Sequence, residues 1–277
     1  MNDAPAEVNM FWWRGSPNFG DTLSRDVVKH LTGAEVIWRR PAKAELFAIG
    51  SLMNFVRKGA RNRPETAPRP IVWGTGFIGP TRTDFLSRVD VRLLRGPVSA
   101  AIANIKHCQF GDPGLLARCI FTAKSQSAEM GLVPHHSQVD NASIQDFIED
   151  NPGVRLIDVR ADAKTVCEQI SACGVIFSSS LHGLIVADSY GVPNYWFESG
   201  NIHEYSRFKF LDYGASVGRR LNAPIALSEI LATWRKHKNP EIPYNDWVSE
   251  VCEALIDTFP KEFKGAATPL DVRFGGK

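Results

Sequence analysis

The chain has 277 residues, of which 44% are hydrophobic and 22% charged, and its formal net charge is +2. This length suits two domains of ordinary size, and two domains imply a cleft between them. The near-balanced charge lacks the clustered basic residues that track a phosphate backbone, so we expect no nucleic acid partner. Local basic runs such as 57–63 are best interpreted as solvated surface, although contact with a membrane surface stays open.

No segment approaches the roughly 20 apolar residues that cross a bilayer, and residues 1–13 lack the basic flank and apolar run of a signal peptide. We therefore expect a cytoplasmic protein, or one at the inner face of the membrane. The five cysteines are odd in number and form no CxxC pair, which argues against a disulfide framework and a thiolate metal site. Other metal-binding spacings are absent, so the sequence predicts neither a metal nor another cofactor.

Short apolar runs alternate with helical patterns along the first half of the chain. Strands are expected over 8–13, 35–38, 46–50, 70–76 and 91–96, with helices over 21–31 and 97–105. This alternation predicts a parallel sheet with helices on both faces. Ligands of such sheets bind at the carboxyl ends of the strands.

A polar stretch at 122–129 marks the expected domain boundary, because the strand and helix alternation then begins again. Further strands are expected over 131–136, 154–158, 174–177 and 192–197, and helices over 142–149, 162–172, 225–237 and 244–258. Another helix, of roughly ten residues, should follow the serines at 178–180 and stop at Gly191. The predicted domains are 1–128 and 129–243, followed by 244–277. In this last segment we expect a helix that packs back on the first domain and a frayed tail after Lys264.

Polar clusters fall at the expected strand ends. The loop RGSPNFGD, residues 14–21, opens a helix, so its N–H groups could face a phosphate or carboxylate. An ordinary turn capped by Asp21 is an equally good interpretation. GTG, residues 74–76, permits close approach of a ligand to the backbone or forms a plain tight turn. Neither pattern is a nucleotide-binding motif.

Arginine and histidine residues follow other predicted strands. Arg95 in LLRGPVS suits a carboxylate or phosphate, and the alternative is an ion pair with Asp112 or another acid. Helix capping explains Asp112 in GDPGLL. In VPHH two adjacent histidines end a strand, and strand neighbours point to opposite faces. We therefore expect His135 to face the cleft and His136 to lie at the surface.

His182 is the strongest single candidate for a catalytic residue. The stretch FSSSLHGLIVADSYGVP, residues 177–193, places it where a strand ends and a helix begins, beside N–H groups that attract anions. The helix favours a neutral imidazole that accepts a proton, whereas a bound phosphate favours an imidazolium that donates one, and both roles stay open. The serines lack a GxSxG motif, so we expect them to hydrogen-bond an anion.

Taken in order, NFGD, GTG, LLRGPVS, GDPGLL, VPHH and SSSLHGLIVADSYGVP resemble the motifs of the polysaccharide pyruvyltransferase family, particularly its bacterial exopolysaccharide members of the succinoglycan type. The match covers about residues 10–215 and includes FKFLDYGASVG near its end. The resemblance implies a GT-B-like α/β fold of two Rossmann-like domains with parallel sheets and an active site in the interdomain cleft. It also implies that phosphoenolpyruvate forms a cyclic ketal with two hydroxyls of a hexose and releases phosphate.

The resemblance implies roles for individual residues. His182 matches the histidine of the family pattern Ser-x-Arg-x-His and would act as acid or base, with His135 as a second catalytic candidate. The expected phosphoenolpyruvate-binding residues are Arg95, Ser178, Ser179, Ser180, Gly183, Arg14, Asn18 and Gly20. The expected acceptor-binding residues are Asp21, Trp73 and Gly76.

The partners that the resemblance implies are phosphoenolpyruvate and a sugar acceptor, carried on a lipid-linked oligosaccharide for an exopolysaccharide. Peripheral membrane association would follow from such an acceptor. Four tryptophans could stack on its sugar rings or pack in the core, namely Trp12, Trp13, Trp73 and Trp196.

One position departs from the family pattern. Many relatives have arginine two residues before the histidine, where this chain has Ser180. Serine has no charge and no bidentate fork, so another cation must compensate. The candidates are Arg95, Arg14, Arg207 and Lys209.

Two other functions stay open. A nucleotide-sugar glycosyltransferase of the GT-B type would need an acidic residue for the ribose, for which Asp188 and Glu198 are available but not well placed. A noncatalytic binding protein could have kept the fold without the arginine at Ser180.

Overall fold

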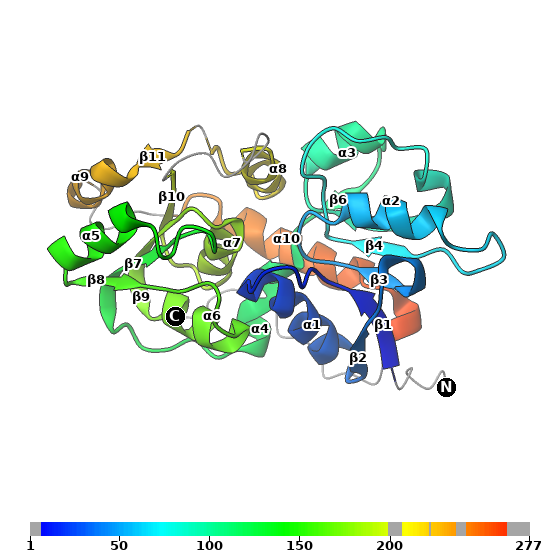
Figure 1. Cartoon of the computed structure of the whole chain (residues 1–277), viewed down its shortest axis with the longest axis horizontal. Helices are drawn as coiled ribbons and strands as arrows, with labels where there is room; N and C mark the ends of the chain where they lie inside the picture. Colours follow the sequence, from blue (N-terminus) through cyan, green and yellow to red (C-terminus); the bar gives the residue numbers. More distant parts are fainter. Residues whose placement is uncertain (1–6, 199–206, 222, 237–241, 265–277) are drawn as a thin grey trace.

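The structure is a computed structural model that describes residues 7–198, 207–221, 223–236 and 242–264. It contains two parallel sheets that lie side by side (Figure 1). Their strand orders are β2-β1-β3-β4-β5-β6 and β11-β10-β9-β7-β8. The predicted α/β class with two Rossmann-like halves is therefore confirmed.

The strands follow the apolar runs of the sequence. Those of the first sheet are β1 (Glu7–Phe11), β2 (Glu35–Trp38), β3 (Leu46–Phe47), β4 (Ile71–Trp73), β5 (Asp90–Leu94) and β6 (Gln109–Phe110). Those of the second sheet are β7 (Ala128–Val133), β8 (Val154–Leu156), β9 (Cys173–Ser178), β10 (Asn194–Glu198) and β11 (Ile225–Ala226).

The helices are α1 (Phe19–Thr32), α2 (Met53–Arg61), α3 (Pro97–Ala103), α4 (Ala117–Ile120), α5 (Ala142–Asp150), α6 (Ala163–Ser171), α7 (Leu181–Ser189), α8 (Phe208–Ser216), α9 (Ile230–Lys236) and α10 (Asn245–Thr258). Helices α1 to α8 lie between consecutive strands in the chain, and α9 and α10 follow the last strand. The helix predicted over 225–237 is wrong in its first turn. The Glu229 carboxylate accepts a hydrogen bond from Ala226 N at 2.7 Å, and the α-helix begins only at Ile230.

Both sheets have the same winding. When the strands of each sheet are numbered from its own first strand, both contain the order 2-1-3-4-5, with β6 added at the edge of the first. In such a sheet the winding reverses between the first and third strands, and a ligand crevice forms at their carboxyl ends. These two switch points lie between β1 and β3 in the first sheet and between β7 and β9 in the second.

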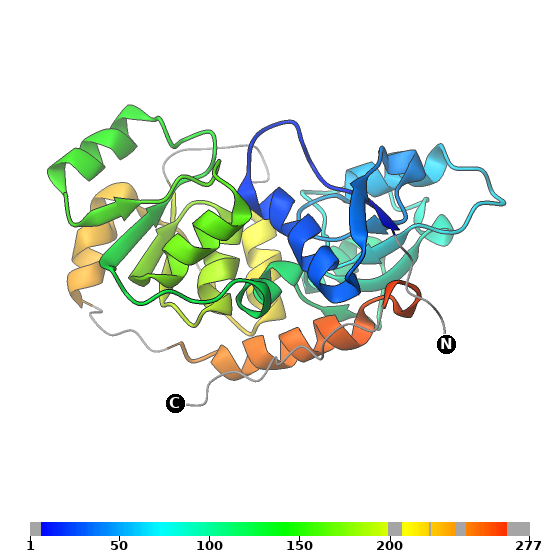
Figure 2. The ribbon, with the colours of Figure 1, turned by 90° about the horizontal axis from the view of Figure 1, so that it is seen from below.

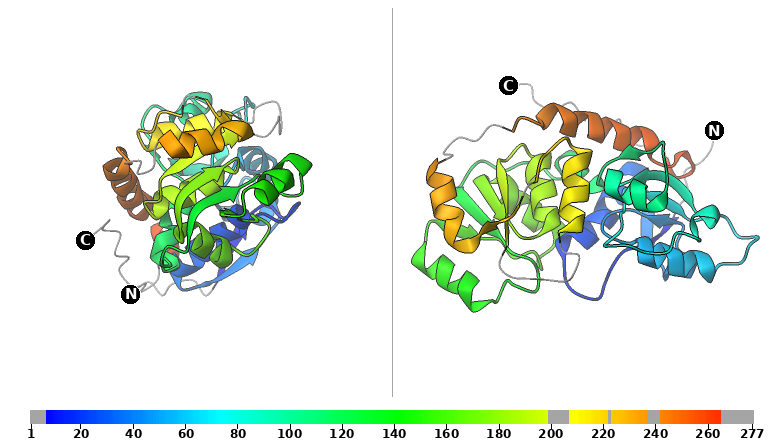
Figure 3. Two further views of the ribbon diagram at one scale, coloured as in Figure 1. Left: turned by 90° about the vertical axis from the view of Figure 1, so that its left-hand side faces the viewer. Right: turned by 90° about the horizontal axis from the view of Figure 1, so that it is seen from above.

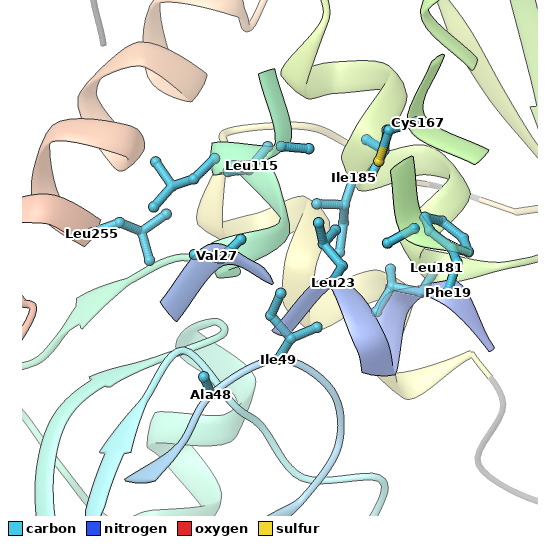
Figure 4. Close-up of a cluster of buried hydrophobic side chains, with 14 of the residues drawn as sticks. Phe19, Leu23, Val27, Ala48, Ile49, Leu115, Cys167, Leu181, Ile185 and Leu255 are labelled. Atoms are coloured by element: carbon cyan, nitrogen blue, oxygen red, sulfur yellow. The ribbon is translucent and has the colours of Figure 1, made fainter. Parts of the chain in front are cut away.

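Apolar side chains join the two halves into one packed body. In the cluster that includes Leu23 of α1, Leu115 and Ile185 of α7, all three side chains are fully buried (Figure 4). Helix α10 runs along both halves, as the views from below (Figure 2) and from above (Figure 3) show. It contacts β5 and β6 of the first half and α7 of the second. The tail after Lys264 that we expected to fray lies outside the described residues.

Candidate active site

A cavity of about 300 Å³ lies between the two switch points. The first half lines it with residues that follow β1, β3 and β4: Trp13, Asn18, Asp21, Gly50, Ser51, Leu52, Phe55 and Ile78. The second half lines it with residues that follow β7 and β9 or belong to α8: His135, Ser180, Leu181, His182 and Lys209. Both crevices thus open into one cavity, which is where a ligand of a doubly wound sheet is expected.

The loop after β1 brings an amide and a carboxyl group to this cavity. Asn18 caps α1, because its side-chain oxygen accepts a hydrogen bond from Gly20 N at 3.3 Å. The alternative in which Asp21 caps the turn is therefore wrong. Asp21 lies in the first turn and is only 7% exposed. Burial raises its pKa to about 7, although Lys209 and the hydrogen bond from Asn18 lower it, so Asp21 is partly protonated near neutral pH.

Gly20 and His182 lie in direct contact across the two halves. A Cβ atom on Gly20 would overlap the imidazole Nδ1 and Cγ of His182. The ring also meets Phe19 edge to face, with ring centroids 6.3 Å apart. Gly20 therefore allows the start of α1 to pack closely against the start of α7. Its missing side chain is explained by this contact and not by a bound anion.

The same imidazole faces a buried carboxyl group on its other side. His182 Nε2 lies 4.0 Å from Asp112 Oδ2, and neither atom has a hydrogen-bond partner in the described part of the chain. Asp112 Oδ1 caps the next turn by accepting from Gly114 N at 2.9 Å. Burial, followed by the charges of Lys209 and Arg95, lowers the pKa of His182 to about 3. Burial raises the pKa of Asp112 to about 6. The histidine is therefore neutral at pH 7.

The serine run fastens two strand ends together. Ser178 Oγ lies 3.0 Å from Val133 O and accepts from Ser180 N, also at 3.0 Å. Ser179 Oγ accepts from His135 N at 2.9 Å. Two of the three hydroxyls predicted to hydrogen-bond an anion are thus engaged within the protein, while Ser180 lines the cavity.

The start of α7 offers backbone donors instead. Ser180 is its N-cap residue without a side-chain cap, and the N–H groups of Leu181 and His182 carry no hydrogen bond among the described residues. Gly183 lies behind them, where a Cβ would overlap Ser178 Oγ. These N–H groups can bind an anion.

Arg95 holds the two halves together. Its guanidinium is fully buried and pairs with Asp212 of α8 at 2.9 Å. It also donates to Phe77 O and to Ser51 Oγ, both at 2.7 Å. The predicted alternative of an ion pair is present, with Asp212 as the acid. Arg95 reaches the cavity only through Ser51.

The neighbouring glycines serve this same contact. A Cβ on Gly96 would overlap the carbonyl of Asp212, and one on Gly76 would lie 2.7 Å from the Arg95 guanidinium. Small residues in GTG and LLRGPVS therefore let α8 approach the first sheet. Close packing against Arg95 is enough to explain the glycine at position 76, and no contact with a sugar acceptor is needed to explain it.

Lys209 is the one lysine or arginine among the described residues that line the cavity. It lies on α8, three residues before Asp212, and is half-buried. Burial and the charge of Arg95 lower its pKa to about 8, while Asp21 opposes that shift. Lys209 and Asp21 are thus electrostatic neighbours. The other cation candidates lie elsewhere, because Arg14 stacks over Trp12 at 4.6 Å and the exposed Arg207 pairs with Glu198 at 2.7 Å.

The tryptophans differ in their access to the cavity. Trp73 is fully buried and donates to Leu255 O at 3.0 Å, so the prediction that it binds the acceptor is wrong. Trp196 stacks on Phe210 with ring centroids 4.4 Å apart. Trp13 is 40% exposed and lines the cavity beside Phe55. Trp12 is buried.

The two adjacent histidines do not point to opposite faces. Their ring centroids are 4.2 Å apart, because β7 ends at Val133 and the chain has left the strand. His135 lines the cavity, with Nδ1 2.9 Å from Ser137 Oγ. His136 is half-buried rather than a surface residue, and burial and Lys209 lower its pKa.

Sequence reasoning missed several residues of the site. Ser51, Phe55 and Ile78 are not among the predicted residues, and Asp112 is predicted only as a cap or as an ion-pair partner of Arg95. No short motif marks the first three, whereas the acidic cap in GDPGLL was a usable signal. The described residues include no cluster of three potential metal-binding side chains. None of the described helices has the length and apolar content that a bilayer crossing requires.

The fold and the site define a two-sheet α/β protein with a small cavity between the sheets, in which apolar side chains surround Asp21, His182 and Lys209. The chain belongs to the polysaccharide pyruvyl transferase family, whose sequence pattern matches residues 18–201. The family resemblance predicted from the motifs is confirmed.

Individual relatives are distant. The chain is 27% identical over 215 residues to the succinoglycan biosynthesis protein ExoV of Rhizobium meliloti (strain 1021), which covers 75% of this chain and 64% of that protein. The chain thus spans less than two thirds of the length of this relative. It is 25% identical over 224 residues to an uncharacterized protein of Acanthamoeba polyphaga mimivirus, covering 76% of this chain and 75% of that one.

Solved structures that are similar include that of a functionally uncharacterized protein from Klebsiella pneumoniae subsp. pneumoniae. It has 11% sequence identity and a TM-score of 0.48, over 80% of this chain and 93% of that one.

Proposed function

We propose that this protein transfers the pyruvyl group of phosphoenolpyruvate to two hydroxyls of one hexose in an exopolysaccharide precursor, which forms a cyclic ketal and releases phosphate. The reaction needs a holder for a phosphate and a carboxylate, a base for the hydroxyl and an acid for the enol carbon. The observation that carries the proposal is the single cavity in which Lys209, His182, Asp21 and the start of α7 converge.

The donor binds at the second-half wall of the cavity. Lys209 supplies the positive charge, and the N–H groups of Leu181 and His182 supply neutral donors, a combination that suits a phosphate or carboxylate. Lys209 therefore takes the place of the arginine that many relatives carry at the position of Ser180. This replacement counts against a noncatalytic protein that has lost its anion-binding charge.

The acid and the base follow from the opposite pKa shifts of two groups. The neutral His182 accepts the proton of the first hydroxyl as that hydroxyl adds to C2. Asp21, whose pKa is about 7, delivers a proton to C3 and turns the methylene into a methyl group. The second hydroxyl then adds to C2 and gives its proton to the Asp21 carboxylate left by the first step. The C2–O bond to phosphate breaks, and the protonated His182 gives its proton to the leaving phosphate.

The acceptor enters beside the first-half wall. Trp13 and Phe55 have ring centroids 5.3 Å apart and form an aromatic surface next to Asp21. Aromatic faces of this kind suit the apolar face of a sugar ring. His135, across the cavity, is a second group within reach of the acceptor. A lipid-linked oligosaccharide would bring the protein to the inner face of the membrane.

The proposal is tested by incubating the protein with phosphoenolpyruvate and a panel of oligosaccharides. Phosphate release that depends on the acceptor is expected. In D₂O the transferred group should carry one deuterium in its methyl group, because C3 takes a solvent-derived proton. Turnover of nucleotide sugars without phosphoenolpyruvate would instead indicate a glycosyltransferase, and binding of phosphoenolpyruvate without turnover would indicate a binding protein.

A further inference from the structure

Asp112 and His182 form a pair across the two halves that a helix cap does not explain. The carboxyl group needs one oxygen for the cap, and Oδ1 fills that role. Its second oxygen is buried, has no hydrogen-bond partner in the described residues and lies 4.0 Å from a ring nitrogen that is also buried and unpaired. Buried polar atoms are almost always hydrogen-bonded. Two such exceptions facing each other therefore indicate a contact that shortens in another state of the protein.

The two nitrogens of the His182 imidazole lie in different environments. Nε2 is turned toward Asp112, whereas the edge with Nδ1 lies over Gly20, beside the cavity that the residue lines. A gap of 4.0 Å is too short for an intervening water and about 1 Å longer than a hydrogen bond. A small movement of the two halves would close it, and catalytic hydrogen bonds often tighten on substrate binding.

We propose that Asp112 is a positioning residue, which holds the proton of neutral His182 on Nε2 and thereby leaves Nδ1 as the proton acceptor toward the substrate. A carboxylate that orients a histidine in this way determines which nitrogen carries the proton. The catalytic consequence rests on the proposed function, whereas the protonated nitrogen is a property of the protein alone.

The substitution Asp112→Asn separates this role from the cap. The amide oxygen can still accept from Gly114 N, so the turn keeps its hydrogen bond. The amide NH₂ then replaces Oδ2 and offers a donor to Nε2, which must become an acceptor. The proton of His182 is expected to move to Nδ1, away from the position that catalysis requires.

Histidine ¹⁵N NMR of the unliganded protein at pH 8 reads this change directly, with the signal assigned by its loss in His182→Gln. The wild-type protein should carry the proton on Nε2 and Asp112→Asn should carry it on Nδ1. A matched control is Asp162→Asn, because Asp162 caps α6 through Thr165 N at 3.0 Å in the same manner. This control should leave the His182 signal unchanged.

Activity measurements give the second readout. Asp112→Asn should lower kcat roughly 100-fold or more with little change in the Kd for phosphoenolpyruvate, while Asp162→Asn should lower neither. The inference is overturned if His182 has the same protonated nitrogen in wild-type and Asp112→Asn protein. It is equally overturned if the wild-type proton lies on Nδ1. If the proton moves as expected and no acceptor supports turnover, the proposed function fails and the positioning role stands.

Discussion

The imidazole of His182 occupies the space that a side chain at Gly20 would fill. The start of α7 in one half is thus pressed against the start of α1 in the other. This contact explains why the two loops that the sequence marked separately belong to one site. It also makes Gly20 a sensitive point in the chain.

Gly20→Ala should displace His182 and lower both stability and turnover. Overpacking of this kind costs about 1–3 kcal/mol, and a misplacement of a catalytic group by about 1 Å can reduce the rate roughly 100-fold. Urea unfolding and phosphate release measure the two effects. Gly153→Ala is the matched control, because a Cβ there meets no atom within 4 Å. Near-normal turnover of Gly20→Ala would contradict the contact.

Lys209→Met should weaken the binding of phosphoenolpyruvate. Hydrogen bonds to charged groups contribute about 1.5–3 kcal/mol, so the Kd measured by calorimetry should rise roughly 10- to 150-fold. Arg207→Gln removes a nearby charge that is exposed and paired with Glu198, and should have little effect.

A double variant tests the role of Lys209 more stringently than Lys209→Met alone. Adding Ser180→Arg to Lys209→Met should restore part of the affinity, since both positions line one cavity. Unchanged affinity in Lys209→Met, or a larger loss in Arg207→Gln, would exclude Lys209 as the compensating cation.

Asp21→Asn should change how stability depends on pH. The pKa of Asp21 rises from 3.8 to about 7 on folding, so its native state holds the proton more tightly than the unfolded state. The stabilisation that comes from this tighter proton binding is fully present below pH 3.8 and is lost as pH rises through 7. The Asp21→Asn variant has no proton to lose at this position, so its stability does not fall for this reason. Its stability relative to wild type should therefore increase between pH 5 and pH 8, by at most about 3 kcal/mol.

Urea unfolding at several pH values provides this measurement. Asp84→Asn is a suitable control, because the hydrogen bond from Arg61 lowers the pKa of this exposed carboxyl group and the shift has the opposite direction. A stability difference for Asp21→Asn that stays constant over the range would show that Asp21 titrates normally.

Arg95→Met should leave the buried Asp212 carboxylate without its cationic partner, with only the hydrogen bonds from Ser99, and destabilise the protein by roughly 3–5 kcal/mol. Arg95→Met and Asp212→Asn should weaken phosphoenolpyruvate binding to a similar degree. Either change loosens α8 and therefore displaces Lys209. Arg92→Gln breaks an exposed pair with Glu262 and should cost about 0–1 kcal/mol. If Arg95→Met abolishes binding while Asp212→Asn leaves it intact, Arg95 contacts the donor directly.

Periodicity and strand-end position predicted much of this molecule. The alternation of apolar runs indicated both parallel sheets, and the glycines and serines around His182 indicated the strand end at which it lies. The role of Arg95 could not be read in the same way. A guanidinium after a strand looks the same in the sequence whether it meets a ligand or Asp212, which lies 117 residues away.

The same limit applies to pairs that form only through tertiary packing. Asp112 satisfies its cap locally, and nothing near it in the sequence indicates His182. Trp73 is the last residue of an apolar strand, and only the docking of α10 shows that its indole donates to Leu255 O. Local chemistry therefore identified the strand ends, while the partners of each side chain depended on the approach of the second half.

A crystal structure with phosphoenolpyruvate bound tests the central claim most directly. We expect the donor in the cavity between the two switch points, with one anionic group on Lys209 Nζ and the N–H groups of Leu181 and His182, and with the imidazole of His182 beside C2. A donor bound at another surface, or in this cavity without contact to Lys209 and His182, would contradict the proposed mechanism.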